Sequence, residues 1–231
     1  MSNSSKKIFK ITDNNVSAIG QMKNSTDTYY IGDPNAKKRL LIVGNSITRH
    51  GPTPEIGWHG DFGMSASSVE KDYVHILASR LREQEDLFIM VRQLAAWERG
   101  YVDGSFDDPL TEERELGADE IVFNLGENVI PLKNEEEKAT FKNALTALLS
   151  KINSKGGKIY FATCFWSSVS VDEVIRSVAD ELTMPVIELG DLGADEKYMA
   201  IGLFEHSGVA HHPGDLGMSV IAERIYKEMR G

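Results

Sequence analysis

Short apolar runs alternate with longer amphipathic stretches along most of the chain. The apolar runs predict buried strands at about residues 39–44, 87–92, 119–124, 157–163 and 185–189. Helices are predicted at about residues 69–84, 135–153, 170–182 and 214–229. In the first helix, Val74, Leu77 and Leu81 recur at three- and four-residue spacing, which places them on one face. Strands that alternate with helices in this way indicate βαβ units around a parallel sheet.

This order of elements predicts an α/β fold. Right-handed crossovers leave few topologies, so we expect a three-layer α/β/α sandwich with a flavodoxin-like, doubly wound, five-stranded parallel sheet. We assign residues 37–231 to this domain and residues 1–36, which do not fit a βα unit, to an amino-terminal extension packed on it. Within the stretch TYYIGDPNAKKR, residues 28–39, we expect a short extended piece and a turn ahead of the first core strand.

Residues 49–68 are rich in glycine and proline and show neither a helical nor a strand period. We expect a long ordered loop over the carboxyl end of the sheet, since loops of this length in compact domains tend to be functional. Trp58 and His59 of this loop, together with Trp97, are candidates for lining a substrate pocket. The aromatic rings can equally serve packing.

Three polar residues stand where chemistry is expected in such a sheet. Ser46 follows the first predicted strand, Asn128 follows the third, and His212 precedes the last helix. Because the carboxyl ends of parallel strands share one edge, these positions can converge. A serine beside a histidine base is a nucleophile. The alternative is structural: Ser46 and Asn128 as turn residues, and His212 as a helix cap before Pro213.

Three motifs around these residues resemble the SGNH hydrolases, also called the GDSL-like lipase and acylhydrolase family. GNSIT at 44–48 is similar to the first block of that family, GEN at 126–128 to the third, and HPGDLGM at 212–218 to the fifth. The resemblance covers most of residues 39–230. Each block alone is a weak signal, whereas their order and their placement at strand ends make a specific set.

The resemblance implies a role for each matched residue. Ser46 would be the nucleophile, His212 the base, and the Asn128 side chain an oxyanion donor, joined by the backbone N–H groups of Ser46 and Ala96. The implied reaction is ester hydrolysis through an acyl-enzyme, on a small-molecule ester with a short acyl group and without a cofactor or metal. A sugar acetate is one candidate substrate.

The sequence departs from the family pattern at three places. Asn45 replaces the aspartate of the first block, and RQLAAWERG at 92–100 replaces the second block, whose glycine N–H completes the oxyanion hole. Any residue other than proline has that N–H, so Ala95, Ala96 or Trp97 must supply it, and Ala96 is the one we name as the candidate. The third departure concerns the acid: it stands three residues before the histidine in the family, and here that position is Val209.

A histidine base needs an acceptor for its second N–H group. The candidate acids are Glu205, on the same loop, and Glu98 and Glu127, which stand beside presumed oxyanion donors. Asp215 is less suitable because it falls in the first turn of a helix, where it can interact with the helix dipole. A backbone carbonyl near Val209 is the remaining option, and it would leave a Ser-His dyad.

Composition bears on the binding partners and on the cellular location of the protein. With 25 basic and 35 acidic residues the net charge is −10, which disfavours nucleic acid. No apolar stretch is long enough for a membrane span, and the amino terminus lacks the apolar core of a secretory signal, so we expect a cytoplasmic protein. The single cysteine, Cys164, lies in an apolar run and is expected to be buried and inert. Composition leaves the oligomeric state open.

Three rival interpretations belong to other classes. A catalytically weakened SGNH-fold protein that binds carbohydrate is favoured by Val209. A metal site of His206, His211, His212 and Asp215 lacks regular ligand spacing. A flavodoxin-like nucleotide binder lacks a glycine-rich phosphate loop.

Overall fold

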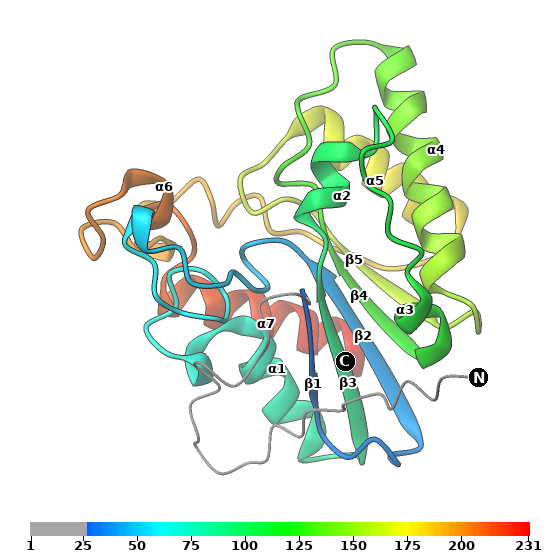
Figure 1. Ribbon diagram of the computed structural model, residues 1–231, viewed down its shortest axis with the longest axis horizontal. Helices are drawn as coiled ribbons and strands as arrows, with labels where there is room; N and C mark the ends of the chain where they lie inside the picture. Colours follow the sequence, from blue (N-terminus) through cyan, green and yellow to red (C-terminus); the bar gives the residue numbers. More distant parts are fainter. Residues whose placement is uncertain (1–26) are drawn as a thin grey trace, which may run out of the picture.

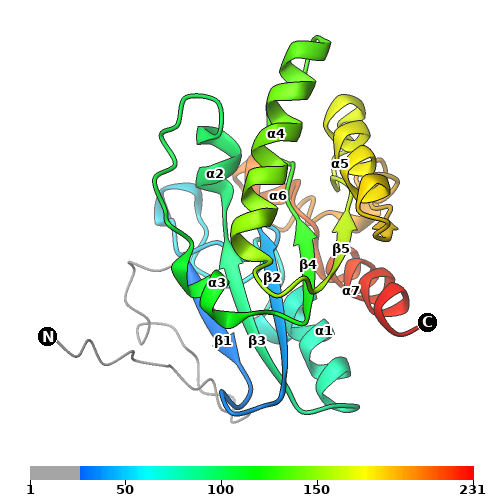
Figure 2. The same ribbon diagram turned by 90° about the vertical axis from the view of Figure 1, so that its right-hand side faces the viewer.

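The computed structural model describes residues 27–231 and shows one sheet between two helical layers (Figures 1 and 2). The strands are β1 (Thr28–Ile31), β2 (Lys38–Gly44), β3 (Leu87–Gln93), β4 (Glu120–Asn124), β5 (Lys158–Ala162) and β6 (Val186–Ile187). The α-helices are α1 (Tyr73–Arg82), α2 (Ala95–Gly100), α3 (Thr111–Leu116), α4 (Glu135–Ile152), α5 (Val169–Glu181), α6 (Ser207–Ala210) and α7 (Asp215–Arg230). Short 3₁₀ turns occupy Pro54–Ile56, Val69–Lys71 and Glu196–Tyr198.

The strand order is β1-β3-β2-β4-β5-β6. The last five strands are parallel, and their order is that of a doubly wound, flavodoxin-like sheet, which confirms the predicted fold class. The prediction of five strands missed β1, which pairs antiparallel with β3 at the edge. Residues 28–39 do contain the expected extended piece, but its four-residue strand is too short to reveal by alternation that it joins the sheet.

The extent of the predicted amino-terminal extension stays a prediction. Residues 1–26 lie outside the described residues, and the rest of residues 1–36 holds β1 and the turn after it. No helix within residues 27–231 is long and apolar enough to cross a membrane.

Both faces of the sheet are buried, as the continuous apolar runs of its strands predict. Alternate residues of β2 serve opposite faces: Leu41 and Val43 pack in the layer of α4 and α5, and Leu40 and Ile42 pack in the layer of α1 and α7. All four side chains are fully buried. Figure 2 shows the sheet between the two layers.

The long helices begin and end close to the predicted bounds. The sequence analysis did not predict α2, α3 and α6, which have six, six and four residues and are too short to show a helical period. The strand order reverses at β2: the chain leaves it through α1 on one face and returns from its neighbour β3 through α2 and α3 on the other. In doubly wound sheets, ligands bind beside the carboxyl ends of the strands at such a reversal.

Candidate active site

Ser46 lies on a tight turn at the carboxyl end of β2. The main-chain oxygen of Asn45 accepts hydrogen bonds from the N–H groups of Thr48 (3.0 Å) and Arg49 (2.9 Å). The Asn45 side-chain oxygen accepts from the N–H group of Ile47 at 3.1 Å. Asn45 is fully buried and Ser46 is partly exposed, so the turn presents the serine hydroxyl at the edge of the sheet.

The hydroxyl of Ser46 meets the imidazole of His212. Their Oγ and Nε2 atoms are 2.9 Å apart. The other ring nitrogen, Nδ1, lies 2.7 Å from the main-chain oxygen of Gly208. A carbonyl only accepts, so Nδ1 carries the proton and Nε2 is free to accept the serine proton. Burial lowers the pKa of His212 to about 4, although the Gly208 carbonyl favours the charged form.

The Gly208 carbonyl accepts the second N–H group of His212, which the acid would accept in the family that the motifs resemble. Val209 is fully buried against Trp58 and Met64, so the family position of the acid is a packing position here. Glu205 is exposed, and the described contacts of His212 do not include it. Of the predicted alternatives, the geometry therefore matches a Ser-His dyad with a neutral acceptor.

The carboxyl group of Glu98, another candidate acid, makes its described hydrogen bonds to groups other than His212. Glu98 is 1% exposed, and one oxygen accepts from the N–H group of Gly126 and from the Asn45 amide at 3.2 Å. The other oxygen accepts from the Asn128 amide at 2.6 Å. Burial raises the pKa of Glu98, and these donors oppose the shift. Glu98 thus connects the first motif, through Asn45, with the third motif, through Gly126 and Asn128.

The Asn128 amide is oriented by two neighbours of opposite type. Its oxygen accepts from Arg99 at 3.1 Å, and its nitrogen donates to Glu98. An amide nitrogen carries two hydrogens, so one N–H group remains for a substrate oxygen. This arrangement has the chemistry of an oxyanion donor.

The Ala96 prediction stays untested. Ala96 is the second residue of α2, whose first-turn N–H groups have no partner within the helix. Its N–H group is therefore a candidate oxyanion donor, beside that of Ser46.

The contact between Asn45 and Glu98 explains why the first motif has an asparagine in place of the usual aspartate. Its amide donates to the buried carboxyl group of Glu98 at 3.2 Å. An aspartate at this position would bring two carboxyl groups together in a buried place, where like charges repel. The amide at position 45 and the carboxyl group at position 98 are therefore complementary.

The sequence analysis missed one aromatic residue. Trp166 follows β5, and its ring meets the His212 ring edge to face, with the ring centres 4.9 Å apart. Trp166 stands at the end of a continuous apolar run, so its sequence context is that of a core residue. The residue pattern carries no signal that distinguishes its role.

Of the two roles left open for Trp58 and Trp97, substrate binding and packing, their burial favours packing. Trp58 is 3% exposed, donates from Nε1 to the His50 carbonyl at 2.9 Å and packs edge-on against Phe62. Trp97 is 5% exposed and packs near Phe141. Both rings fill apolar clusters and leave little surface for a substrate. His59, in contrast, is exposed.

The loop of residues 49–68 contacts both the turn that carries Ser46 and the segment that precedes His212. The N–H group of Met64 donates to the main-chain oxygen of Ser46 at 2.9 Å. The hydroxyl of Ser65 donates to the main-chain oxygen of Val209 at 2.5 Å. This loop therefore fixes the serine turn relative to the segment that carries His212.

The residues of the metal alternative have separate contacts. The N–H group of Val209 donates to His206 at 3.4 Å, and Nδ1 of His211 lies 2.7 Å from the Ser207 carbonyl. Asp215 binds Lys71 at 2.8 Å. In the described part of the chain, no group of three or more His, Cys, Asp or Glu side chains is placed to hold a metal ion. Cys164 is buried, as expected.

Comparisons with known proteins bear on the fold. Neither a protein-family model nor a curated protein sequence matches the chain. A putative GDSL-like lipase from Bacteroides ovatus is 20% identical, with a TM-score of 0.55 over 84% of this chain and 98% of that one. A lipase/acylhydrolase from Enterococcus faecalis is 16% identical, with a TM-score of 0.55 over 83% and 95%. A family two carbohydrate esterase from Cellvibrio japonicus is 13% identical, with a TM-score of 0.51 over 84% and 61%.

The chain therefore has the three-layer α/β/α fold of GDSL-like lipases, acylhydrolases and esterases. The resemblance predicted from three short motifs is confirmed at the level of the fold. The identities are too low to carry the activity across, so the roles of individual residues rest on the geometry above.

The pairing of Asn45 with Glu98 leads to a stability prediction. Asn45→Asp should lower the free energy of unfolding by about 2 kcal/mol at pH 7, because a buried carboxyl group loses a donor and gains a like charge. The pair would have a raised pKa in the folded state, so it takes up a proton more readily than the unfolded chain does as the pH falls, and the loss should be smaller at pH 5 than at pH 7. Urea unfolding at both pH values measures the effect.

The matched control is Asn35→Asp, at an exposed asparagine whose amide also donates to a carboxyl group, that of Asp33, at 3.0 Å. It should change the free energy of unfolding far less, because water screens the two like charges there. An Asn45→Asp variant as stable as the parent protein at pH 7 would contradict the pairing.

Proposed function

We propose that the protein is a serine esterase that hydrolyses short-chain carboxylic esters through an acyl-enzyme on Ser46. The observation that carries this proposal is the 2.9 Å contact between Ser46 Oγ and His212 Nε2, with Nδ1 of the same ring held by the Gly208 carbonyl. A nucleophile, an oriented base and an amide donor at one edge of the sheet are the parts that acyl transfer requires.

In the proposed reaction, Ser46 attacks the ester carbonyl while His212 accepts its proton. His212 then gives that proton to the leaving alcohol and activates a water molecule for deacylation. The negative oxygen of each tetrahedral intermediate is bound by Asn128 and by the N–H groups of Ser46 and Ala96. Removal of one such donor typically costs a factor of about 10² to 10³ in rate.

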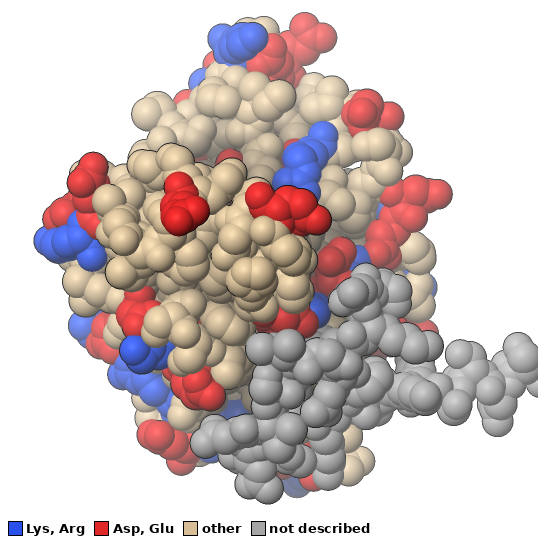
Figure 3. All heavy atoms as spheres, turned by 60° about the vertical axis from the view of Figure 1, so that its left-hand side comes forward, with Lys and Arg blue, Asp and Glu red and all other residues tan. Residues whose placement is uncertain are grey.

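The surface suits an uncharged small-molecule substrate. Figure 3 shows that few charged side chains interrupt the side of the molecule that carries α6 and the loop of residues 49–68. With a net charge of −10, the chain offers no general attraction for a polyanion such as nucleic acid.

A second candidate function is a carbohydrate-binding protein of the same fold with weakened catalysis. The neutral Gly208 carbonyl favours it, because a carbonyl fixes the tautomer of His212 but supplies no negative charge to stabilise the imidazolium. Incubation with a fluorophosphonate probe separates the two functions. An esterase is labelled once per chain, and Ser46→Ala abolishes the label, whereas a binding protein is not labelled.

The first activity prediction concerns the dyad. Ser46→Ala and His212→Ala should each abolish most hydrolysis of p-nitrophenyl acetate, by similar factors, and the double variant should lose little more, because the two groups act as a unit. Glu205→Gln is the matched control and should retain the parent rate, since Glu205 does not contact His212 in the described interactions. Additive losses would contradict the assignment.

The second activity prediction concerns Asn128. Asn128→Ala should reduce kcat by about 10²-fold with a small change in KM, because an oxyanion donor acts mainly in the transition state. Arg99→Ala removes the neighbour of the Asn128 oxygen and leaves the N–H groups, so its effect should be much smaller. A change confined to KM would assign Asn128 to substrate binding instead.

The third activity prediction concerns pH. His212 must be neutral to accept a proton, and burial lowers its pKa to about 4. The value of kcat/KM should therefore stay constant as the pH falls through 6.5, the ordinary value, and decline only near pH 4. Circular dichroism at each pH checks that the protein remains folded. A decline centred between pH 6 and 7 would show that the imidazole is not shielded as described.

A further inference from the structure

A four-residue turn in the loop of residues 49–68 holds a serine in an unusual backbone conformation. The turn runs from Gly63 to Ala66, and the N–H group of Ala66 closes it by donating to the Gly63 carbonyl at 3.2 Å. Ser65, its third residue, has a φ of 74°, in the left-handed region that favours glycine. A serine there carries strain that a glycine would avoid, so its side chain needs an explanation.

The hydroxyl of Ser65 connects this turn with the candidate base. Ser65 is 2% exposed, and its Oγ donates to the main-chain oxygen of Val209 at 2.5 Å. The same oxygen accepts from the main-chain N–H group of His212 at 3.0 Å. Figure 1 shows the loop of residues 49–68 beside α6, which contains Val209. One carbonyl therefore binds both the strained serine and the segment that carries His212.

The residue before Ser65 contacts the turn of the nucleophile. The N–H group of Met64 donates to the main-chain oxygen of Ser46 at 2.9 Å. Two adjacent residues, Met64 and Ser65, thus bond to the two segments of the dyad. The separation of Ser46 and His212 accordingly depends on this short link.

Two acids hold the turn in place. The N–H group of Gly63 donates to the fully buried carboxyl group of Asp72, the N-cap of α1, at 3.1 Å. The N–H group of Ser67 donates at 2.8 Å to Asp215, the first residue of α7. A strained conformation persists only where its surroundings over-determine it. Anchors on two helices, one on each side of Ser65 in the chain, meet that condition.

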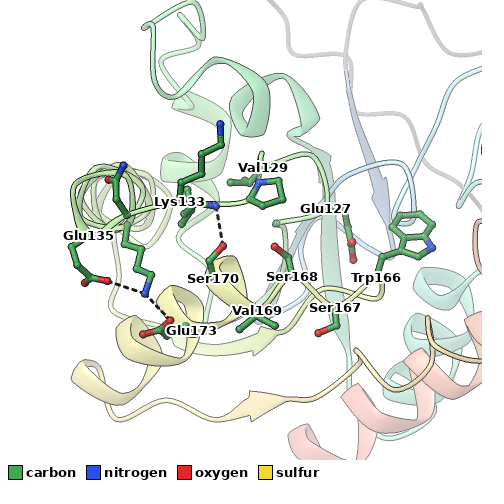
Figure 4. A pocket seen from close by; sticks show the side chains of 15 residues that line it. Glu127, Val129, Lys133, Glu135, Trp166, Ser167, Ser168, Val169, Ser170 and Glu173 are labelled. Carbon is green, nitrogen blue, oxygen red and sulfur yellow. Dashed lines mark hydrogen bonds and ion pairs between the residues drawn. The ribbon is translucent and has the colours of Figure 1, made fainter.

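An aromatic ring supports His212 from another direction. Trp166, which lines the hollow shown in Figure 4, meets the His212 ring with the ring centres 4.9 Å apart. Aromatic contacts tolerate a range of offsets, whereas a hydrogen bond fixes both a distance and a direction. The bond from Ser65 to Val209 is therefore the more precise constraint.

We propose that Ser65 is a positioning residue, whose hydroxyl holds the Val209 carbonyl, and with it the main chain of His212, so that the imidazole reaches Ser46. The backbone strain is retained because glycine, which would remove it, has no hydroxyl to donate. This inference rests on the proposed esterase function and adds to it a residue that acts through the main chain of His212.

Two variants separate positioning from stability. Ser65→Ala and Ser65→Gly both lose the hydroxyl, but only Ser65→Gly also relieves the strain. Both should lower kcat for p-nitrophenyl acetate by on the order of tenfold with a small change in KM, because a slightly misplaced base slows the chemical step. In urea unfolding, Ser65→Gly should have the higher midpoint. A kcat that recovers in Ser65→Gly would show a purely structural role and overturn the proposal.

Thr183→Gly is the matched control. Thr183 also has a positive φ, of 54°, and is exposed just after α5. Relief of strain there should raise the urea midpoint and leave kcat unchanged. If Thr183→Gly lowered kcat as much as Ser65→Gly does, the activity would respond to backbone strain in general, and the role of the Ser65 hydroxyl would be refuted.

A second measurement does not need turnover. The nitrogen NMR shift of His212 Nε2 reports whether this atom accepts a hydrogen bond. Ser46→Ala gives the reference shift for a His212 that lacks the Ser46 hydroxyl. Ser65→Ala should move the shift of the parent protein toward this reference.

The two proposals fail in different ways. If the parent protein hydrolyses the ester and Ser65→Ala matches it in kcat and in the Nε2 shift, the positioning role is overturned and the esterase function stands. If the parent protein does not hydrolyse the ester but Ser65→Ala moves the Nε2 shift as described, the esterase function fails and Ser65 still positions His212.

Discussion

Buried carboxyl groups hold the loops that follow the central strands, and the geometry of the candidate site depends on them. Glu98 of α2 accepts from the main chain of Gly126, and Glu127 accepts in turn from the main chain of Phe165. Asp172 of α5 accepts from the N–H groups that follow β5. Loops at this edge leave N–H groups without strand partners, and each must find an acceptor. The three acids supply it and set the spacing between neighbouring loops.

Burial of these acids constrains the side chains around them. The pKa values of Glu98 and Glu127 are both raised, so any further negative charge nearby is costly. Amides at positions 45 and 128 satisfy the Glu98 carboxyl group without adding charge. The neutral main-chain carbonyl of Gly208 orients His212. No carboxyl group is among the described hydrogen-bond partners of His212, so the orientation of this base also adds no negative charge. Departures from the family motifs therefore form one consistent electrostatic arrangement.

The sequence predicted the parts of the molecule that local patterns encode. Apolar runs located the parallel strands, and three short motifs located Ser46, Asn128 and His212, which the fold brings to one edge. Local patterns could not predict contacts between residues that are distant in the sequence. The contact of Glu98 with two motifs, and the packing of Trp58 and Trp97, depend on which elements become neighbours.

The acceptor that fixes His212 belongs to the main chain. A carboxylate acid can be deleted by one codon change, whereas every amino acid at position 208 still brings a carbonyl group. The orientation of the base is thus encoded in the path of the short helix α6 rather than in a side chain. Sequence drift can alter the exposed positions of this segment, such as Ser207, as long as the backbone conformation survives, whereas buried Val209 is constrained by packing. Relatives with the same arrangement would therefore show no conserved acidic residue there.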